Sequence, residues 1–322
     1  MMIDTPSTLI FGPVPSRRLG RSLGINHIPP KTCTYACVYC QLGRTSRLQI
    51  TRQRFYAPET IVAAVKAKLA ALARAGEAVD YLTLVPDGEP TLDLHLRMLL
   101  MQLKPLGLPL AVITNASLLD EPAVQEALLL ADWVSLKVDA AAEATWRHVD
   151  RPHGRLLWAN ILDGAREFAR RFAGALVTET MLVAGLNNAP DALAATAAAV
   201  AELHPAIAYL SVPTRPPAEA WVKPPTAAAL TQAYHLFTAA LPHVELLTGY
   251  EGNAFAATGD AAADLLSITA VHPLCADAVG DLLAHDGATW EVVDELTARG
   301  ALVATPYNQH IFYLRGYTIH EN

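Results

Sequence analysis

The chain has 322 residues, 52% of them hydrophobic, which is enough to bury one large domain or two unequal ones. Its formal net charge of −7 argues against a surface that binds nucleic acid everywhere, because such binding depends on Lys and Arg set against phosphates. No apolar run is long enough to span a bilayer, so no membrane partner is expected. We therefore expect a globular, cytoplasmic protein.

Short apolar runs alternate with longer stretches of helical period, which predicts a parallel sheet built from strand-helix units. The runs expected to form strands begin at Ser22, Tyr81, Pro109, Trp133, Ala175 and Ala208. The stretches expected to form helices begin at Pro58, Leu92, Glu121, Leu157, Asp191 and Thr226. Six such units predict an α/β fold in which the sheet is a closed or three-quarter-closed barrel.

The end of the chain, from about Asp260, has a different pattern. Two expected helices (273–284 and 289–300) are followed by two expected strands (301–307 and 310–316). Two helices followed by a hairpin are typical of a winged-helix unit. The expected domains are a barrel over residues 1–250, a linker rich in Gly and Ala over 251–262, and a winged-helix-like domain over 263–322.

Polar residues follow several of the predicted strands. In a barrel of parallel strands the chemistry lies at the carboxyl ends of the strands, where loops bring polar groups together. Each group alone is ordinary for a strand-to-helix turn, but their recurrence after successive strands favours a site. The groups are Asp87–Pro90, Thr114 with Asn115, Lys137 with Asp139, Asn187 with Asn188, and Pro213–Arg215.

Three of the four cysteines, Cys33, Cys37 and Cys40, lie within eight residues. This is not a disulfide framework, and it suits a reducing compartment in which thiolates bind metals or take part in catalysis. Zinc would need a fourth ligand, for which His27 is the nearest candidate, and zinc sites usually carry their ligands on two short knuckles. An iron-sulfur cluster fits better, because three thiolates on a four-iron cluster leave one iron without a protein ligand.

The spacing C-x3-C-x2-C, with Tyr39 directly before the last cysteine, resembles the signature of the radical S-adenosylmethionine (SAM) superfamily. The resemblance implies a [4Fe-4S] cluster on Cys33, Cys37 and Cys40, with the methionine part of SAM on the open iron. It also implies a partial (β/α)6 barrel of the radical SAM type.

Positions for the contacts with SAM follow from the same resemblance. Asp87–Pro90 is similar to the Gly-Gly-Glu motif that holds the methionine amino group, with Asp87 in place of the first Gly. Gly88 and Glu89 would contact that amino group, and Tyr39 would lie near the adenine. The other positions implied to contact SAM are Thr114, Asn115, Ser135, Lys137 and Asp139.

A longer resemblance covers nearly the whole chain. Segments such as FGPVPSRRLGRSLGIN, VPDGEPTL, PTRPPAEAWVKPP and LLTGYEGN are similar to a mostly uncharacterised radical SAM group related to the wyosine-synthesis tRNA enzyme. That enzyme resembles a two-cluster machine with a second cysteine triad, whereas this chain has only Cys275 left. The second half of the wyosine chemistry therefore has no counterpart in this sequence.

The resemblance implies an enzyme that cleaves SAM reductively to a 5′-deoxyadenosyl radical, which abstracts hydrogen from a substrate. An electron donor such as flavodoxin or ferredoxin is then an expected partner. A peptide, a protein or tRNA is the expected substrate, held by the tail. Within the tail, the acidic residues Glu291, Asp294 and Glu295 favour a protein or peptide over nucleic acid. A small metabolite and a non-catalytic iron-sulfur protein that transfers electrons or binds a partner remain open alternatives.

Three residues are candidates for catalysis: Glu179, Arg215 and Cys275. The guanidinium fork of Arg215 suits a carboxylate or a phosphate, or else forms a rigid surface turn beside two prolines. Cys275 either quenches a substrate radical or is a buried helix residue, as lone cysteines usually are. The candidates for contact with the substrate are Arg17, Arg18, Arg21, Tyr250 and Glu251.

Overall fold

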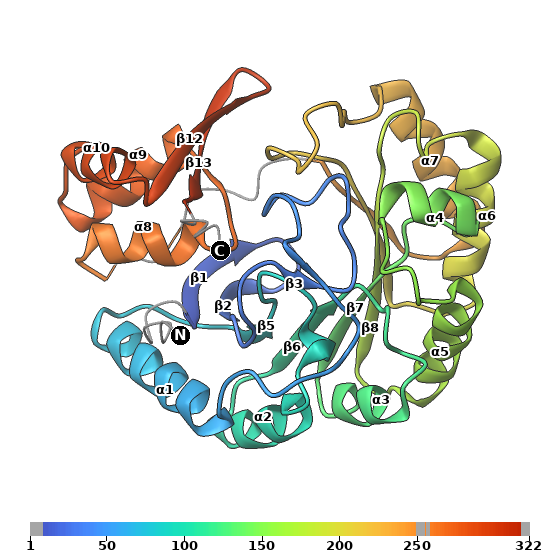
Figure 1. Cartoon of the computed structure of the whole chain (residues 1–322), viewed down its shortest axis with the longest axis horizontal. Coiled ribbons are helices and arrows are strands. Elements are labelled where there is room, and N and C mark those ends of the chain that lie inside the picture. The colour runs from blue at the N-terminus through green and yellow to red at the C-terminus, as the bar shows by residue number, and fades with distance from the viewer. Residues whose placement is uncertain (1–8, 249–254, 256–257, 317–322) are drawn as a thin grey trace.

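A curved eight-stranded sheet forms the larger part of the computed structural model, which describes residues 9–248, 255 and 258–316. The strand order is β1-β2-β5-β6-β7-β8-β9-β10, and all neighbours from β2 to β10 are parallel. The helices between the strands cover the outer side of this sheet (Figure 1). The expected partial barrel of strand-helix units is therefore confirmed.

The six predicted strands are all present, and two more extend the sheet at its edges. The six are β2 (Gly20–Ile25), β5 (Tyr81–Leu84), β6 (Leu110–Thr114), β7 (Trp133–Lys137), β8 (Ala175–Met181) and β9 (Ile207–Ser211). The additional strands are β1 (Ile10–Ser16) and β10 (Val244–Leu247). The sequence IFGPVPS of β1 contains two prolines, which an edge strand tolerates because one side of it lacks a partner in the sheet. β1 pairs with β2 in the antiparallel direction.

Seven α-helices connect these strands, and three of them, α1, α3 and α6, begin with a proline in the first turn, where no backbone donor is lost. They are α1 (Pro58–Arg74), α2 (Leu96–Leu103), α3 (Pro122–Leu128), α4 (Glu143–Val149), α5 (Trp158–Arg171), α6 (Pro190–Ala201) and α7 (Ala227–Ala240). Short 3-10 helices occur at η2 (Pro90–Leu92) and η3 (Lys104–Leu106). The two-residue strands β3 (Thr32–Cys33) and β4 (Arg47–Leu48) pair beside the cysteines.

Residues 258–316 form a second unit, called here the C-terminal unit. Its elements are α8 (Ala261–Thr269), β11 (Leu274–Cys275), α9 (Ala276–Asp286), α10 (Glu291–Ala298), β12 (Leu302–Tyr307) and β13 (His310–Arg315). The three strands form an antiparallel sheet in the order β11-β13-β12. Helix α8 begins inside the stretch expected to be linker, because its first turn is the Ala-rich sequence that we interpreted as a connection.

The C-terminal unit packs against the edge of the barrel at β1 (Figure 1). The hydroxyl of Ser267 donates to the carbonyl of Ile10 over 3.2 Å, and Phe11 packs against Val271. Further along, the hydroxyl of Tyr307 donates to the carbonyl of Pro213 over 3.0 Å. These contacts bring the C-terminal unit to the carboxyl ends of the barrel strands. No helix in the described part of the chain is long and apolar enough to cross a membrane.

Candidate active site

A cavity of about 360 Å³ lies at the carboxyl ends of the barrel strands. Its wall includes the loop that carries the three cysteines (residues 33–40, called here the cysteine loop) and the ends of the barrel strands. β1 and the residues Val271 and His272 of the C-terminal unit complete the wall. Most of the residues that the sequence singled out meet here. They are Arg17, Arg18, Cys33, Cys37, Tyr39, Cys40, Gly88, Glu89, Thr114, Asn115, Lys137, Glu179 and Arg215.

Four other candidates are not part of the cavity wall. Ser135 is buried within β7, two residues before Lys137, and Asp139 is buried behind the wall. The guanidinium of Arg21 forms an ion pair with Glu77. Cys275 belongs to β11 and to the apolar core of the C-terminal unit. The remaining two candidates, Tyr250 and Glu251, lie outside the described residues.

The cysteine loop is held by backbone hydrogen bonds to itself and to the end of α4. The amide of Cys40 donates to the carbonyl of Cys37 over 3.1 Å, and that of Val38 donates to Val149 over 2.9 Å. Burial raises the pKa of all three thiols, Cys33, Cys37 and Cys40. Bare thiolates are therefore disfavoured in this loop, and a bound cation or cluster would be needed to stabilise them.

The arrangement of the cysteines fits a cluster better than a single metal ion. Among the residues that the structure describes, no three His, Cys, Asp or Glu side chains converge closely enough to hold one ion. Tetrahedral zinc needs such convergence, whereas a four-iron cluster spreads its three thiolates over separate irons. Because Cys33, Cys37 and Cys40 all face one cavity, the residues present fit a [4Fe-4S] cluster.

The carboxylate of Glu89 is held rigidly in the wall of the cavity. Its Oε1 accepts hydrogen bonds from the hydroxyls of Thr91 (2.5 Å) and Thr114 (2.6 Å). Its Oε2 accepts from the amide of Asn115 over 2.8 Å. Burial raises the pKa of Glu89, and these hydrogen bonds oppose that rise. A fixed carboxylate of this kind can receive an ammonium group from the cavity.

Gly88 explains why the segment before Glu89 can approach the cysteine loop. Its φ is +154°, and a Cβ at this position would collide with the carbonyl oxygen of Thr32. That carbonyl accepts a hydrogen bond from the amide of Glu89 over 3.1 Å. The glycine therefore allows the loop after β5 to pair directly with β3, which carries Cys33.

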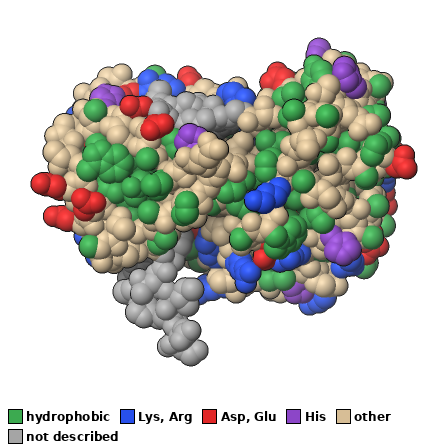
Figure 2. All heavy atoms as spheres, turned by 90° about the horizontal axis from the view of Figure 1, so that it is seen from above, with side chains coloured by type: hydrophobic (Ala, Val, Ile, Leu, Met, Phe, Trp, Pro, Cys, Tyr) green, Lys and Arg blue, Asp and Glu red, His purple; other side chains and the backbone are tan. Residues whose placement is uncertain are grey.

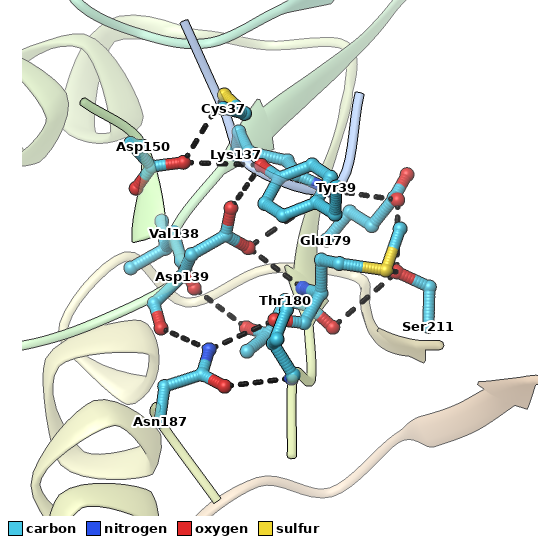
Figure 3. Close-up of polar contacts among 12 residues, drawn as sticks. Cys37, Tyr39, Lys137, Val138, Asp139, Asp150, Glu179, Thr180, Asn187 and Ser211 are labelled. Carbon is cyan, nitrogen blue, oxygen red and sulfur yellow. Dashed lines mark hydrogen bonds and ion pairs between the residues drawn. The ribbon is translucent and has the colours of Figure 1, made fainter. Parts of the chain in front are cut away.

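Tyr39 joins two buried carboxyl groups (Figure 3). Its hydroxyl makes a short hydrogen bond to Asp139 and lies 3.0 Å from Oδ1 of Asp150. The same Oδ1 of Asp150 lies 3.4 Å from the sulfur of Cys37. Burial, together with the carboxyl group of Asp139, raises the pKa of Asp150 far above its usual range. Burial therefore favours the protonated form in the pair Asp139 and Asp150 beside the cysteine loop.

A second cluster of polar side chains, besides that of Tyr39, Asp139 and Asp150, surrounds Glu179 in the barrel. Its carboxylate accepts from Arg18 (2.6 Å), from Lys137 (2.9 Å) and from the hydroxyl of Ser211 (3.0 Å), as Figure 3 shows for the last two. Burial alone would raise the pKa of Glu179, but the two cations hold it well below its usual range. Lys137 also lies 4.9 Å from the ring centroid of Tyr39. Lys137 therefore connects the cluster around Tyr39 with the cluster around Glu179.

Arg215 links the cysteine loop to the C-terminal unit. Its Nη1 donates to Oε1 of Gln41 over 3.0 Å, and its Nη2 lies 2.9 Å from Nε2 of His272. Burial, with the guanidinium beside it, holds the pKa of His272 well below its usual range. His272 is therefore neutral and accepts the hydrogen bond from Arg215. The candidate Arg215 thus lies in the wall of the cavity, half-buried, and not on an exposed surface turn.

Sequence reasoning missed several residues of this site. Asp150 follows α4, and only the folded chain brings it to Tyr39 and Cys37. His272 comes from the C-terminal unit, and Ser211 and Gln41 follow apolar or cysteine segments without a motif of their own. No spacing rule in the sequence distinguishes these residues from ordinary loop residues.

Comparison with known proteins agrees with this geometry. The family model of the radical SAM superfamily matches residues 28–197, which include the cysteine loop and the strands from β5 to β8. The chain is similar to UPF0026 protein MJ1312 of Methanocaldococcus jannaschii, with 39% identity over 96% of both chains. It is also 35% identical to a UPF0026 protein of Helicobacter pylori over 65% of this chain and 67% of that one.

Two solved structures are similar to this chain, and the first of them shows the same kind of fold. SuiB of Streptococcus suis, in complex with its precursor peptide SuiA, matches 69% of this chain and 48% of its own with a TM-score of 0.51 and 13% identity. The structure of TYW1 with a lysine-pyruvate adduct matches 92% of this chain and 80% of its own with a TM-score of 0.44 and 12% identity. From the family match and the UPF0026 relatives, the chain belongs to the radical SAM superfamily of enzymes, whose cofactors are a [4Fe-4S] cluster and SAM.

Proposed function

We propose that Cys33, Cys37 and Cys40 hold the cluster and that SAM and the substrate occupy the cavity beside them. When bound and reduced, the cluster supplies the electron that cleaves SAM to a 5′-deoxyadenosyl radical, which abstracts hydrogen from the substrate. The observation that carries this proposal is the meeting of all three cysteines with the rigid carboxylate of Glu89 in one cavity.

The residues around the cavity would bind and orient SAM. Glu89 would accept hydrogen bonds from the methionine amino group, since its carboxylate is fixed by Thr91, Thr114 and Asn115. Lys137, which the carboxylates of Asp139 and Glu179 keep charged, would face the carboxylate or the ribose. Ser135 and Asp139 would act from behind the wall, because neither lines the cavity.

Val271 and His272 would help to exclude water from the cavity, because they close its wall from the side of the C-terminal unit. Arg215, fixed by Gln41 and His272, would contact an anionic group of the substrate. Arg17 and Arg18 line the same cavity and are further candidates for that contact.

A peptide or protein is the proposed substrate, with the C-terminal unit as its winged-helix-like holder. The support is the charge of α10, whose first turn contains Glu291 and Asp294 and would repel phosphates. Acidic side chains also gather at the end of the molecule formed by the C-terminal helices (Figure 2). tRNA is the weaker candidate for the same reason. The wyosine reaction is not proposed, because Cys275 alone remains and lies in the core of the C-terminal unit.

A small metabolite is the second candidate substrate. It is favoured because Val271 and His272 of the C-terminal unit line the same cavity as the cysteines, so the cavity is walled from both units. The electron would come from a donor such as flavodoxin or ferredoxin. The free thiols of the loop require reducing conditions, which supports the cytoplasm as the place of action.

The test is the cleavage of SAM by the reconstituted protein under strong reductant. We expect 5′-deoxyadenosine from the parent protein, and deuterium in that product when the correct labelled substrate is added. Glu89→Gln should retain its iron but bind SAM at least tenfold more weakly, whereas Glu245→Gln, on an exposed position of β10, should behave like the parent. A parent protein that holds four irons and forms no 5′-deoxyadenosine would contradict the proposed reaction.

A further inference from the structure

Lys31 and Asp87 form an ion pair directly behind the cysteine loop. A parallel bridge between Thr32 and Gly88 aligns the residues before them, so that Nζ of Lys31 lies 3.3 Å from Oδ2 of Asp87. The side chains are 17% and 3% exposed. At this depth, opposite charges act on their surroundings with little screening by salt.

The ammonium group of Lys31 lies over the turn that carries Cys40. A Cβ built on Gly43 would be 4.0 Å from Nζ of Lys31, and the amide of Gly43 donates to the carbonyl of Cys40 over 3.1 Å. The backbone of Asp87, the other member of the pair, is fixed because its amide donates to Oδ1 of Asn26 over 3.1 Å.

Neither residue of the pair lines the cavity, so neither would touch a bound SAM molecule. Asp87 stands where the Gly-Gly-Glu motif of the superfamily has a glycine, and a glycine could not balance the charge of Lys31. The two charges can still act on the site through their electric field, because Lys31 lies beside the turn that carries Cys40.

We propose that Lys31 and Asp87 are a positioning pair of opposite charges that sets the reduction potential of the cluster through Cys40. The inference rests on the proposed ligation of the cluster by the three cysteines. Reduction adds negative charge, so the cation of Lys31 raises the potential and the carboxylate of Asp87 offsets part of that rise. The reduction potential of the parent protein therefore reflects the difference between these two opposite effects.

The test is a redox titration of the reconstituted cluster without SAM, followed by electron paramagnetic resonance. Lys31→Met should lower the midpoint potential, Asp87→Asn should raise it, and the double variant should return towards the parent value. The matched control is Lys68→Met, which breaks the pair of Lys68 and Asp264 (3.6 Å, side chains 18% and 4% exposed) between α1 and α8. This control should leave the potential unchanged.

Two single variants that shift the potential in the same direction, or not at all, would overturn the inference. If Lys31→Met does not retain iron, Asp87→Asn decides alone, with Asp87→Glu as the variant that keeps the charge and the parent potential. An unchanged potential in Asp87→Asn would then overturn it. A parent protein that assembles no cluster would instead contradict the proposed ligation.

Discussion

The barrel and the C-terminal unit bury different kinds of residue. The barrel interior contains carboxyl side chains, among them Glu89, Asp139 and Asp150, which are held by hydrogen bonds and, for Asp139, by an ion pair with Lys137. The core of the C-terminal unit is built mainly from aliphatic and aromatic side chains such as Leu265 and Phe312, and its buried carboxyl group, Asp264, pairs with Lys68. Buried charges cost free energy unless they are paired, so they are expected where chemistry requires them. The difference agrees with the proposal that the barrel performs the chemistry and that the C-terminal unit contributes to the wall of the cavity.

The largest effect should come from the cysteines, which divide between the two regions. Changing Cys33, Cys37 or Cys40 to Ala should abolish the cluster, because each change removes one of its three proposed thiolate ligands. Cys275→Ala should retain about four irons per chain, because this cysteine is buried in the core of the other unit. Iron and sulfide analysis, together with the visible absorption of the cluster, measures the cluster content of the loop variants and of Cys275→Ala. A full cluster in a loop variant would assign the ligands elsewhere.

A smaller effect is expected from the core of the C-terminal unit. Leu265→Ala removes a fully buried side chain from α8 and should lower the free energy of unfolding by about 2–5 kcal/mol. The variant should still assemble the cluster, because the proposed ligands lie in the barrel. Denaturant unfolding of the apoprotein and iron analysis check these two statements. Loss of iron in this variant would show that the barrel depends on the C-terminal unit for its fold.

His272 should make the stability of the folded chain sensitive to pH. Because its pKa in the folded chain is depressed, the unfolded chain binds more protons once the pH falls below about 6.5. Stability should therefore fall as the pH falls, by up to about 1.4 kcal/mol per pH unit for this one group. Unfolding free energies at pH 7 and pH 5.5 should show a smaller difference in His272→Phe than in the parent.

The control for that measurement is His235→Phe, on an exposed position of α7, which should keep the parental dependence. Some dependence should remain in His272→Phe as well, because burial also lowers the pKa of His27 in the barrel. An identical pH dependence in His272→Phe and in the parent would mean that His272 is not held neutral in the wall of the cavity.

The smallest effect concerns the contact between the two units. Tyr307→Phe removes the hydrogen bond to the carbonyl of Pro213 and should cost about 1 kcal/mol of stability. It should also weaken SAM binding only slightly, because Tyr307 does not line the cavity. Calorimetric unfolding and a binding titration measure the two quantities. A large loss of SAM affinity would show that this contact controls the shape of the cavity.

The sequence predicted the barrel well because its pattern is local. Strands such as β7 are short apolar runs, and helices such as α1 have buried residues at helical spacing, so each element is visible in a short window. β1 was missed because the prolines in it argue against a strand unless its place at the edge is known. α8 was missed because a run of alanines without a stop signal also suits a linker.

The site was predictable only where a motif carries the chemistry. The spacing of Cys33, Cys37 and Cys40 can be recognised in the sequence alone, and so can Glu89 within the motif Asp87–Pro90. The contact of Asp150 with Tyr39 and that of His272 with Arg215 join positions far apart in the chain. Such contacts depend on how loops from different elements meet, which no local pattern encodes.

The contacts of Arg18 have a consequence for the ligands that the cavity can bind. From the turn between β1 and β2 its guanidinium reaches Glu179, 5.9 Å from the ring centroid of Trp133 and 5.7 Å from that of Tyr209. Together with the apolar cluster of Leu19, Trp133 and Tyr209, it fills the floor of the barrel. Arg18 also lines the cavity, where Glu179 already neutralises its charge. An anionic ligand that is to bind Arg18 would therefore have to displace the carboxylate of Glu179 from a buried ion pair.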